Sequence, residues 1–313
     1  MSENDKRRLA LITGISGGLA QQVAEVLAGQ GFEIVGVDYR AVPDEVPHVA
    51  ALYQANYNKT KIEDIFRRHR PSHVLHLGRV GNLKERMGKR FDLNVIGSRK
   101  VMDLAQKYGA RRLIVLSTFH IYGAHPHNHI PIAEDEPLRA GQAFPQIADA
   151  IQLDNQAVAW LYRNADVPTV LFRPCNVVGP LISNAMSRFL RQPTKPVIMG
   201  FNPMSQFIHE RDLVSAIVRA SERDARGVFN IAGRGTIPVR DAIDIAGGTQ
   251  IPVPAGFAAA VLRAARMVMP ALPPYLINFF KYPAVITDDA FREAFDWEPE
   301  IGQVEAVRST VGI

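Results

Sequence analysis

The first residues suited to chemistry are the glycines of an early turn and a later aspartate. The turn, residues 13–20 (TGISGGLA), follows the apolar run 9–12, and Asp38 ends the next apolar run. Glycine lets a backbone approach a pyrophosphate, and a helix beginning in such a turn directs free N–H groups at phosphates. A carboxylate at position 38 can accept both ribose hydroxyls of an adenosine, which favours NAD over NADP, although Arg40 weakens that preference. The contacts expected here are Gly14, Ser16, Gly17, Gly18, Leu19, Asp38 and Tyr39.

A glycine-rich turn also has a plainer explanation, because such turns join strands to helices without binding a ligand. The order of apolar strand, turn, amphipathic helix, second strand and acid favours the dinucleotide. Ala20 stands in the third glycine position, where it still allows close packing of helix and strand.

Alternating histidines form the second group of candidate ligands. His125, His127 and His129 precede the acidic run 134–136, and imidazole with carboxylate can bind a metal. The loop context and the absence of cysteine partners argue against such a site, so we expect no metal.

These residues need elements to position them, and strands alternate with helices along most of the chain. Regular alternation predicts an α/β fold of Rossmann type, a doubly wound parallel sheet with helices on both faces and ligands beyond the carboxyl ends of the strands. Beyond residue 174 alternation fades, and Pro193, Pro196 and Pro203 predict irregular chain. We expect a nucleotide-binding domain over 1–173, to which about 204–232 returns, and a smaller mixed C-terminal lobe over 174–313. The expected strands are 9–12, 33–37, 51–54, 73–77, 112–116, 169–172 and 228–231, and the expected helices are 20–27, 59–68, 92–108 and 147–164.

Composition excludes several classes of protein. The 313 residues are 47% hydrophobic, enough for a large core, and the net charge of +5 is too small and scattered for a nucleic-acid-binding protein. The single cysteine, Cys175, permits no intrachain disulfide and favours the cytoplasm. The apolar segment 257–270 is too short to span a bilayer; it fits a helix packed on its own domain or on a second subunit, or a membrane-surface contact.

Ordered motifs from Leu9 to Gly233 resemble the extended short-chain dehydrogenase/reductase superfamily, which includes the NAD-dependent sugar epimerases and dehydratases. The resemblance implies a bound nicotinamide cofactor, a small-molecule substrate that is often a nucleotide sugar, and a homodimer paired through helices 92–108 and 147–164. The motifs are Thr13-Gly-x-x-Gly17, Asp38, His76-Leu77-Gly78, Asn94-Val95-x-Gly97, Leu116-Ser117-Thr118 with Tyr122-Gly123, Arg173-Pro174 with Val178-Gly179-Pro180, and Asn230-Ile231.

The resemblance also extends the expected cofactor site along the sheet edge. Asn56 replaces the usual aspartate near adenine, and its amide oxygen can still accept from the adenine amino group. Arg79 stands where the family has a small residue, so it can reach a phosphate or intrude on the nicotinamide pocket. The contacts added by the resemblance are Asn56, Tyr57, Leu77, Gly78, Arg79, Asn94, Leu116 and Pro174.

The catalytic residues implied by the resemblance are only partly present. The family uses a serine or threonine, a tyrosine and a lysine four residues after it; Thr118 takes the hydroxyl position, but Gln146 and Ala150 stand where the tyrosine and lysine belong. Glutamine exchanges no proton at neutral pH, and alanine carries no charge. His120 is the best substitute acid or base, with Tyr122 a further candidate, although a structural histidine is the plainer interpretation.

Two functions therefore remain open. The first is an NAD(P)-dependent oxidoreductase of the epimerase/dehydratase type with an atypical active site. The second is an NAD(P)-binding sensor or scaffold without turnover. The missing tyrosine and lysine favour the second, whereas the retained turn, Asp38 and Thr118 favour the first.

Overall fold

The apolar run before the glycine turn forms the central part of a seven-stranded sheet. Strand β1 is buried at all of its 5 positions and pairs in parallel with β2 and β4. The order β11-β6-β5-β4-β1-β2-β3 contains the 3-2-1-4-5-6 arrangement of doubly wound dinucleotide-binding sheets. The predicted Rossmann-type fold is confirmed. The strands are β1 (Leu9–Thr13), β2 (Glu33–Asp38), β3 (Ala51–Gln54), β4 (His73–His76), β5 (Arg112–Leu116), β6 (Thr169–Pro174) and β11 (Gly227–Ile231).

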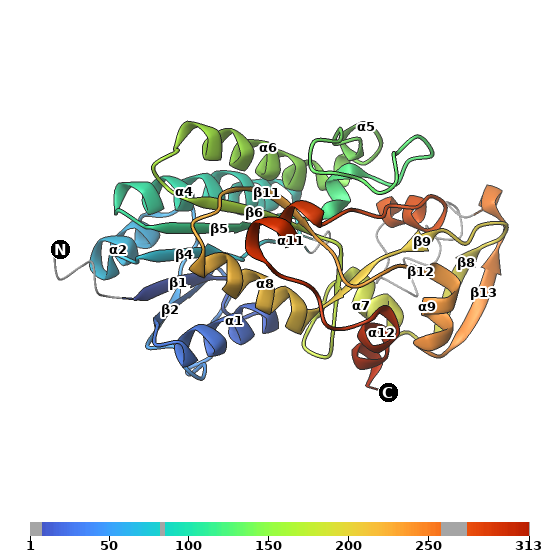
Figure 1. Ribbon diagram of the computed structural model, residues 1–313, viewed down its shortest axis with the longest axis horizontal. Coiled ribbons are helices and arrows are strands. Elements are labelled where there is room, and N and C mark those ends of the chain that lie inside the picture. The colour runs from blue at the N-terminus through green and yellow to red at the C-terminus, as the bar shows by residue number, and fades with distance from the viewer. Residues whose placement is uncertain (1–7, 82–84, 258–273, 313) are drawn as a thin grey trace. The chain divides into compact units, whose positions relative to one another are not determined.

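Helices cover both faces of this sheet, with α4 and α6 on one face and α1 and α8 on the other (Figure 1). Helix α1 buries Ala20, Val23, Ala24 and Leu27, the residues whose spacing predicted it. The helix expected over 92–108 begins as a π-helical segment, η2, before it continues as α4. The bounds are α1 (Gly18–Gly29), α2 (Thr60–His69), α3 (Met87–Phe91), η2 (Asp92–Gly97), α4 (Ser98–Lys107), α6 (Ala148–Arg163) and α8 (Glu210–Glu222).

The computed structural model describes residues 8–81, 85–257 and 274–312, which divide into two compact units. The first contains the chain up to Ser117 with Asp149–Phe172 and Val214–Phe229. The second contains Thr118–Ala148, Arg173–Leu213 and the chain from Asn230. The remaining elements are η3 (Phe119–Tyr122), α5 (Ala140–Ala143), η4 (Pro145–Ile147), β7 (Asn176–Val178), α7 (Ala185–Leu190), β8 (Thr194–Ile198), β9 (Met204–Ser205), β10 (Phe207–His209), β12 (Ile237–Pro238), α9 (Val239–Ile245), β13 (Thr249–Val253), η5 (Ala255–Phe257), η6 (Pro274–Phe280), α11 (Asp289–Phe295) and α12 (Gln303–Val311).

The proline-rich chain of the second unit is more regular than its sequence predicts. Strand β8 pairs in parallel with β13, and Pro196 stands opposite Ile251. Proline cannot donate a backbone hydrogen bond, but a strand in a two-stranded ladder needs donors on only one side. The prediction of irregular chain around Pro196 is therefore wrong.

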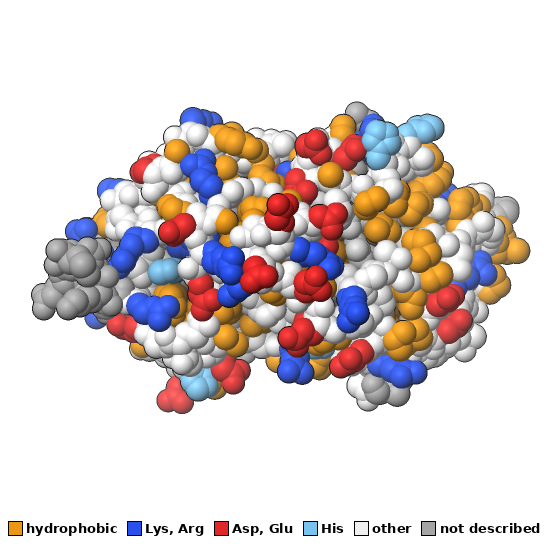
Figure 2. Space-filling model, in the orientation of Figure 1, with side chains coloured by type: hydrophobic (Ala, Val, Ile, Leu, Met, Phe, Trp, Pro, Cys, Tyr) orange, Lys and Arg blue, Asp and Glu red, His pale blue; other side chains and the backbone are white. Residues whose placement is uncertain are grey.

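Charges of both signs are interspersed on the face shown in Figure 2, in keeping with 36 Lys and Arg against 31 Asp and Glu. Among the described residues, no helix has the length and apolar character needed to cross a membrane. The apolar segment 257–270 lies outside the described residues apart from its first residue.

A buried histidine joins the two central strands of the first unit. The Nδ1 atom of His76 lies 2.8 Å from Thr13 Oγ1, and its Nε2 atom lies 2.7 Å from Ser98 Oγ. The Gly78 N–H also donates to Thr13 Oγ1, at 3.1 Å. Burial lowers the pKa of His76 from 6.5 to about 4.

This pKa predicts a loss of stability in mild acid. Above pH 6.5 the ring is neutral in both the folded and the unfolded chain, whereas below it only the unfolded chain takes up the proton. The contribution of His76 to the free energy of unfolding therefore falls by about 1.4 kcal/mol for each pH unit below 6.5, until the folded chain is protonated near pH 4. Urea unfolding of the wild type and His76→Gln should show their stability difference shrinking between pH 7 and pH 5. An unchanged difference would contradict this origin of the pH dependence.

Candidate functional site

The glycine turn after β1 depends on the absence of a side chain at Gly14. Its φ is +78°, and a Cβ atom there would lie 2.7 Å from Gly78 Cα and 2.9 Å from Gly78 N. The Gly14 N–H donates to Val37 O at 2.8 Å, which ties the turn to the end of β2. The ends of β1, β2 and β4 thus meet at the point where the strand order reverses, which is the ligand-binding position of such sheets.

The start of helix α1 leaves its N–H groups available to an anion. Gly17 caps the helix without any side-chain hydrogen bond, and the first turn contains no acidic residue. Backbone N–H groups and the positive end of the helix dipole therefore meet at one place. This cradle fits the phosphates of a dinucleotide.

Asp38 is held at the end of β2, where a ribose-binding carboxylate was predicted. It is fully buried, and its Oδ2 atom accepts the Ser16 N–H at 3.1 Å. The main chain and the guanidinium of Arg40 also donate to Asp38. The carboxylate is thus fixed by the turn on one side and covered by Arg40 on the other.

Other predicted cofactor contacts of the first unit lie where strands β3, β4 and β5 end. The Asn56 amide oxygen accepts the Asn58 N–H at 2.8 Å. Tyr57 is 1% exposed, and its hydroxyl has no hydrogen-bond partner among the described residues. Burial raises the pKa of Tyr57, so this phenol stays protonated. Leu77, Gly78 and Arg79 follow β4, and Leu116 is the last residue of β5. Pro174 is the last residue of β6 and belongs to the second unit.

Thr118 and His120 form a hydrogen-bonded pair just after β5. Thr118 Oγ1 and His120 Nδ1 are 2.8 Å apart, and the His120 N–H donates to the same hydroxyl at 3.4 Å. Thr118 caps the short helix η3, a local motif that brings the imidazole back onto the hydroxyl. The rings of Phe119 and Phe279 lie 4.4 Å and 5.1 Å from the His120 ring, centroid to centroid. The Thr118 hydroxyl and the His120 ring are thus in hydrogen-bond contact, at the position where the sequence predicts a catalytic hydroxyl.

Tyr122 lies in a buried network instead. Its hydroxyl donates to Asn230 Oδ1 at 2.8 Å and accepts from Arg173 Nη1 at 2.7 Å, and the residue is 1% exposed. Arg173 also donates to the Glu134 carbonyl, and Glu134 Oε1 accepts the Asn230 N–H. With donor and acceptor engaged, this phenol is better suited to holding the unit together than to moving a proton.

The position of the missing lysine, Ala150, directly follows a member of a buried ion pair that sequence reasoning missed. Arg90 is hydrogen-bonded to Asp149, the residue before Ala150, and their side chains are 4% and 1% exposed. The second oxygen of Asp149 accepts from Asn94, which also bonds the main chain of Val80 in both directions. The predicted cofactor contact Asn94 therefore links the loop after β4 to the start of α6.

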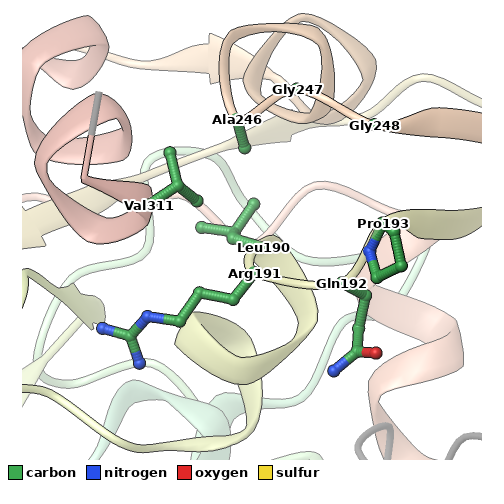
Figure 3. A pocket seen from close by; sticks show the side chains of 8 residues that line it. All are labelled: Leu190, Arg191, Gln192, Pro193, Ala246, Gly247, Gly248 and Val311. Atoms are coloured by element: carbon green, nitrogen blue, oxygen red, sulfur yellow. The ribbon is translucent and has the colours of Figure 1, made fainter.

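The second unit also contains the histidine loop and a pocket. His129 Nδ1 lies 2.8 Å from Glu136 Oε1, and no group of three metal-binding side chains occurs among the described residues. The pocket has a volume of about 340 Å³, and none of the site residues predicted from the sequence lines it. The Arg191 guanidinium extends away from Gly247 and Gly248 (Figure 3). It donates hydrogen bonds to the carbonyl oxygens of Thr310 and Ile182. The pocket is lined by Leu190, Arg191, Gln192, Pro193, Ala246, Gly247, Gly248 and Val311.

The turn geometry makes a direct prediction for Gly14→Ala. A methyl group would collide with the Gly78 backbone in a left-handed conformation, so we expect a stability loss of about 1–3 kcal/mol and at least tenfold weaker NAD binding. Gly29→Ala is the matched control, because no atom lies within 4 Å of its added Cβ and alanine suits a helix. Unfolding and calorimetric titration measure both. Equal behaviour of the two variants would contradict the close approach at Gly14.

Most of the chain is similar to proteins of known family or fold. Residues 10–232 match the model of the NAD dependent epimerase/dehydratase family. An uncharacterized protein of Mycobacterium tuberculosis is 30% identical to this chain over 220 residues. The aligned region covers 69% of this chain but only 58% of that protein, which is little more than half of the relative's length. A probable UDP-glucuronate 4-epimerase of Rhizobium meliloti is 31% identical over 238 residues, 67% of each chain. The structure of the Bordetella bronchiseptica enzyme WbmG in complex with NAD superimposes with a TM-score of 0.76 at 22% identity, covering 100% of this chain and 95% of that one.

Proposed function

Because the chain belongs to the NAD dependent epimerase/dehydratase family, we propose that it binds NAD and transforms a nucleotide sugar or a small carbonyl compound. The observation that carries this proposal is the cradle formed by the Gly14 turn, the uncapped start of α1 and the buried Asp38. The name of the Rhizobium relative and the NAD bound to WbmG support the same assignment.

The residues assigned to the cofactor follow the sheet edge. The turn from Gly14 to Leu19 would hold the pyrophosphate, Asp38 the adenosine ribose, and Tyr39 with Asn56 and Tyr57 the adenine end. Leu77, Gly78, Arg79, Asn94, Leu116 and Pro174 would complete the site. Bound NAD would supply a hydride acceptor for a carbon that bears a hydroxyl.

The proton is assigned to the Thr118–His120 pair. Thr118 Oγ1 would accept the proton of a substrate hydroxyl while its own proton passes to His120 Nδ1, 2.8 Å away. A neutral imidazole can accept a proton on one ring nitrogen and return it later, so this route uses neither Tyr nor Lys. The reverse transfer would return the proton to the product.

A second candidate is a non-catalytic NAD-binding sensor or scaffold. It is favoured by Gln146 and Ala150, since neither side chain can replace the family's tyrosine or lysine. The two candidates share the cofactor site and differ only in turnover.

Calorimetric titration of the purified chain with NAD tests the shared part of both candidates. We expect one site per chain and a clear binding enthalpy. Failure to bind NAD would contradict both candidates together.

Further proposals concern assembly and organisation. Phe91, Ile96 and Tyr162 expose apolar side chains on or next to helices 92–108 and 147–164, which supports pairing of two copies there. We also propose a cytoplasmic location, a nucleotide-binding role for 1–173 with 204–232, and a substrate-binding role for 174–313.

A further inference from the structure

The side chain of Tyr57 extends from the chain after β3 to the glycine turn after β1. A Cβ atom built on Gly78 would lie 2.2 Å from Tyr57 Oη and 2.8 Å from Gly14 N, so the phenol hydroxyl and the main chain of the turn approach the same point. All three residues belong to the first compact unit. The Tyr57 hydroxyl therefore lies at the turn that the proposed function assigns to the pyrophosphate.

Two glycines leave room for the Tyr57 side chain. A Cβ atom on Gly97 would lie 2.8 Å from Tyr57 Cβ, and one on Gly78 would lie 3.0 Å from Tyr57 Cζ. The rings of His76 and Tyr39 meet the Tyr57 ring edge to face, at centroid distances of 5.4 Å and 6.3 Å. Close packing thus fixes the ring, and the hydroxyl is preorganised at the turn.

The Tyr57 hydroxyl is buried at this place without a hydrogen bond. The residue is 1% exposed, and Oη has no hydrogen-bond partner in the part of the chain that the structure describes. A buried polar group without a partner destabilises the folded chain, and such groups are rare in native proteins. The hydroxyl of Tyr53, in contrast, lies 2.8 Å from His69 Nε2. The Tyr57 hydroxyl is therefore available to a ligand at the turn.

The surroundings of Tyr57 make this hydroxyl a donor. Burial raises the pKa of Tyr57, and the charge of Asp38 raises it further. The Gly14 N–H and the Arg40 guanidinium oppose this increase without cancelling it. The phenol therefore keeps its proton at neutral pH, and a charged oxygen is the acceptor that an O–H group binds most strongly. Helix α1 begins at the same turn with N–H groups that suit an anion.

We propose that the Tyr57 hydroxyl donates a hydrogen bond to an anionic oxygen of the dinucleotide pyrophosphate. The bond supplies the buried hydroxyl with an acceptor and adds a side-chain donor to the main-chain donors of the turn. Tyr57 is thus a binding residue for the diphosphate, whereas the family resemblance implies only a contact near adenine. The inference rests on the proposed dinucleotide site and adds to it a specific contact with the diphosphate.

Tyr57→Phe tests this contact, because it removes the hydroxyl and keeps the packed ring. Urea unfolding without ligand should give a midpoint equal to or higher than that of the wild type, because a buried hydroxyl without a partner is destabilising. Calorimetric titration should show NAD and ADP binding at least about tenfold more weakly. The dissociation constant of adenosine, which has no phosphate, should be the same in both proteins when it is measured by competition with NAD.

Tyr53→Phe is the matched control, since it removes a phenol hydroxyl of the same unit that is bonded to His69. It should lower the urea midpoint slightly and leave the affinities for NAD and ADP unchanged. Equal NAD affinity of the wild type and Tyr57→Phe would overturn the inference, as would an equal loss of affinity for adenosine. A lower midpoint for Tyr57→Phe would show that the hydroxyl is already bonded in the free protein and would also overturn it. Absence of NAD binding by the wild type would instead overturn the proposed function.

Discussion

Replacing His120 by glutamine or Thr118 by valine is expected to lower kcat by ~10²–10⁴-fold and to leave NAD affinity unchanged. The two side chains form one unit, with Oγ1 and Nδ1 2.8 Å apart, so either change removes the same proton path. The double variant should therefore be little slower than either single variant. Steady-state kinetics on a nucleotide sugar, with calorimetric titration of NAD, would measure both quantities.

His127→Gln is the matched control, because this exposed histidine of the same loop region belongs to no proposed proton path. It should keep wild-type kcat. Full turnover by His120→Gln would show that another group transfers the proton. A parallel loss of NAD affinity would show that His120 supports the fold of the site instead.

Replacing Arg90 by methionine is expected to lower the free energy of unfolding by about 3–5 kcal/mol. The methionine keeps most of the apolar stem but leaves Asp149, whose side chain is 1% exposed, without its cationic partner. Removing one member of a buried ion pair costs more than the pair itself contributes, because a buried charge then remains uncompensated. Urea unfolding at neutral pH would measure the change.

Two comparison variants separate this effect from the general loss of an arginine. Arg67→Met breaks an exposed pair and should cost no more than about 1 kcal/mol. Arg90→Met combined with Asp149→Leu removes both charges and should recover much of the loss. A single Arg90 variant as stable as Arg67→Met would contradict the buried pair.

Much of the fold could be predicted from local pattern. The burial of Ala20, Val23, Ala24 and Leu27 in α1 follows directly from their helical spacing, and β1 from its continuous apolar run. The strand β8 could not be predicted, because Pro196 argues against a strand unless the edge position of that strand is known. Edge position depends on tertiary structure, which local sequence does not specify.

Some residues of the candidate site could be predicted from the sequence, and others could not. Gly14 and Asp38 were predictable because the conformation and charge that they provide depend on residue type at a fixed spacing in a strand–turn–helix unit. The Arg90–Asp149 pair was not, since a charged residue in a helix is usually exposed and the partner is distant in sequence. Sequence suggested His120 as the proton donor or acceptor, but only the structure shows its contact with Thr118.

The most direct test of the whole account is to mix NAD-saturated wild-type protein with UDP-glucuronate and UDP-glucose. Absorbance would follow reduction of the bound nicotinamide, and chromatography would follow the sugars. We expect transient reduction or an altered sugar with at least one substrate, and neither with His120→Gln. The test would then be extended to a wider panel of nucleotide sugars and small carbonyl compounds. If bound NAD stayed oxidised and every compound were recovered unchanged, the result would contradict catalysis. The protein would then be one that only binds the cofactor.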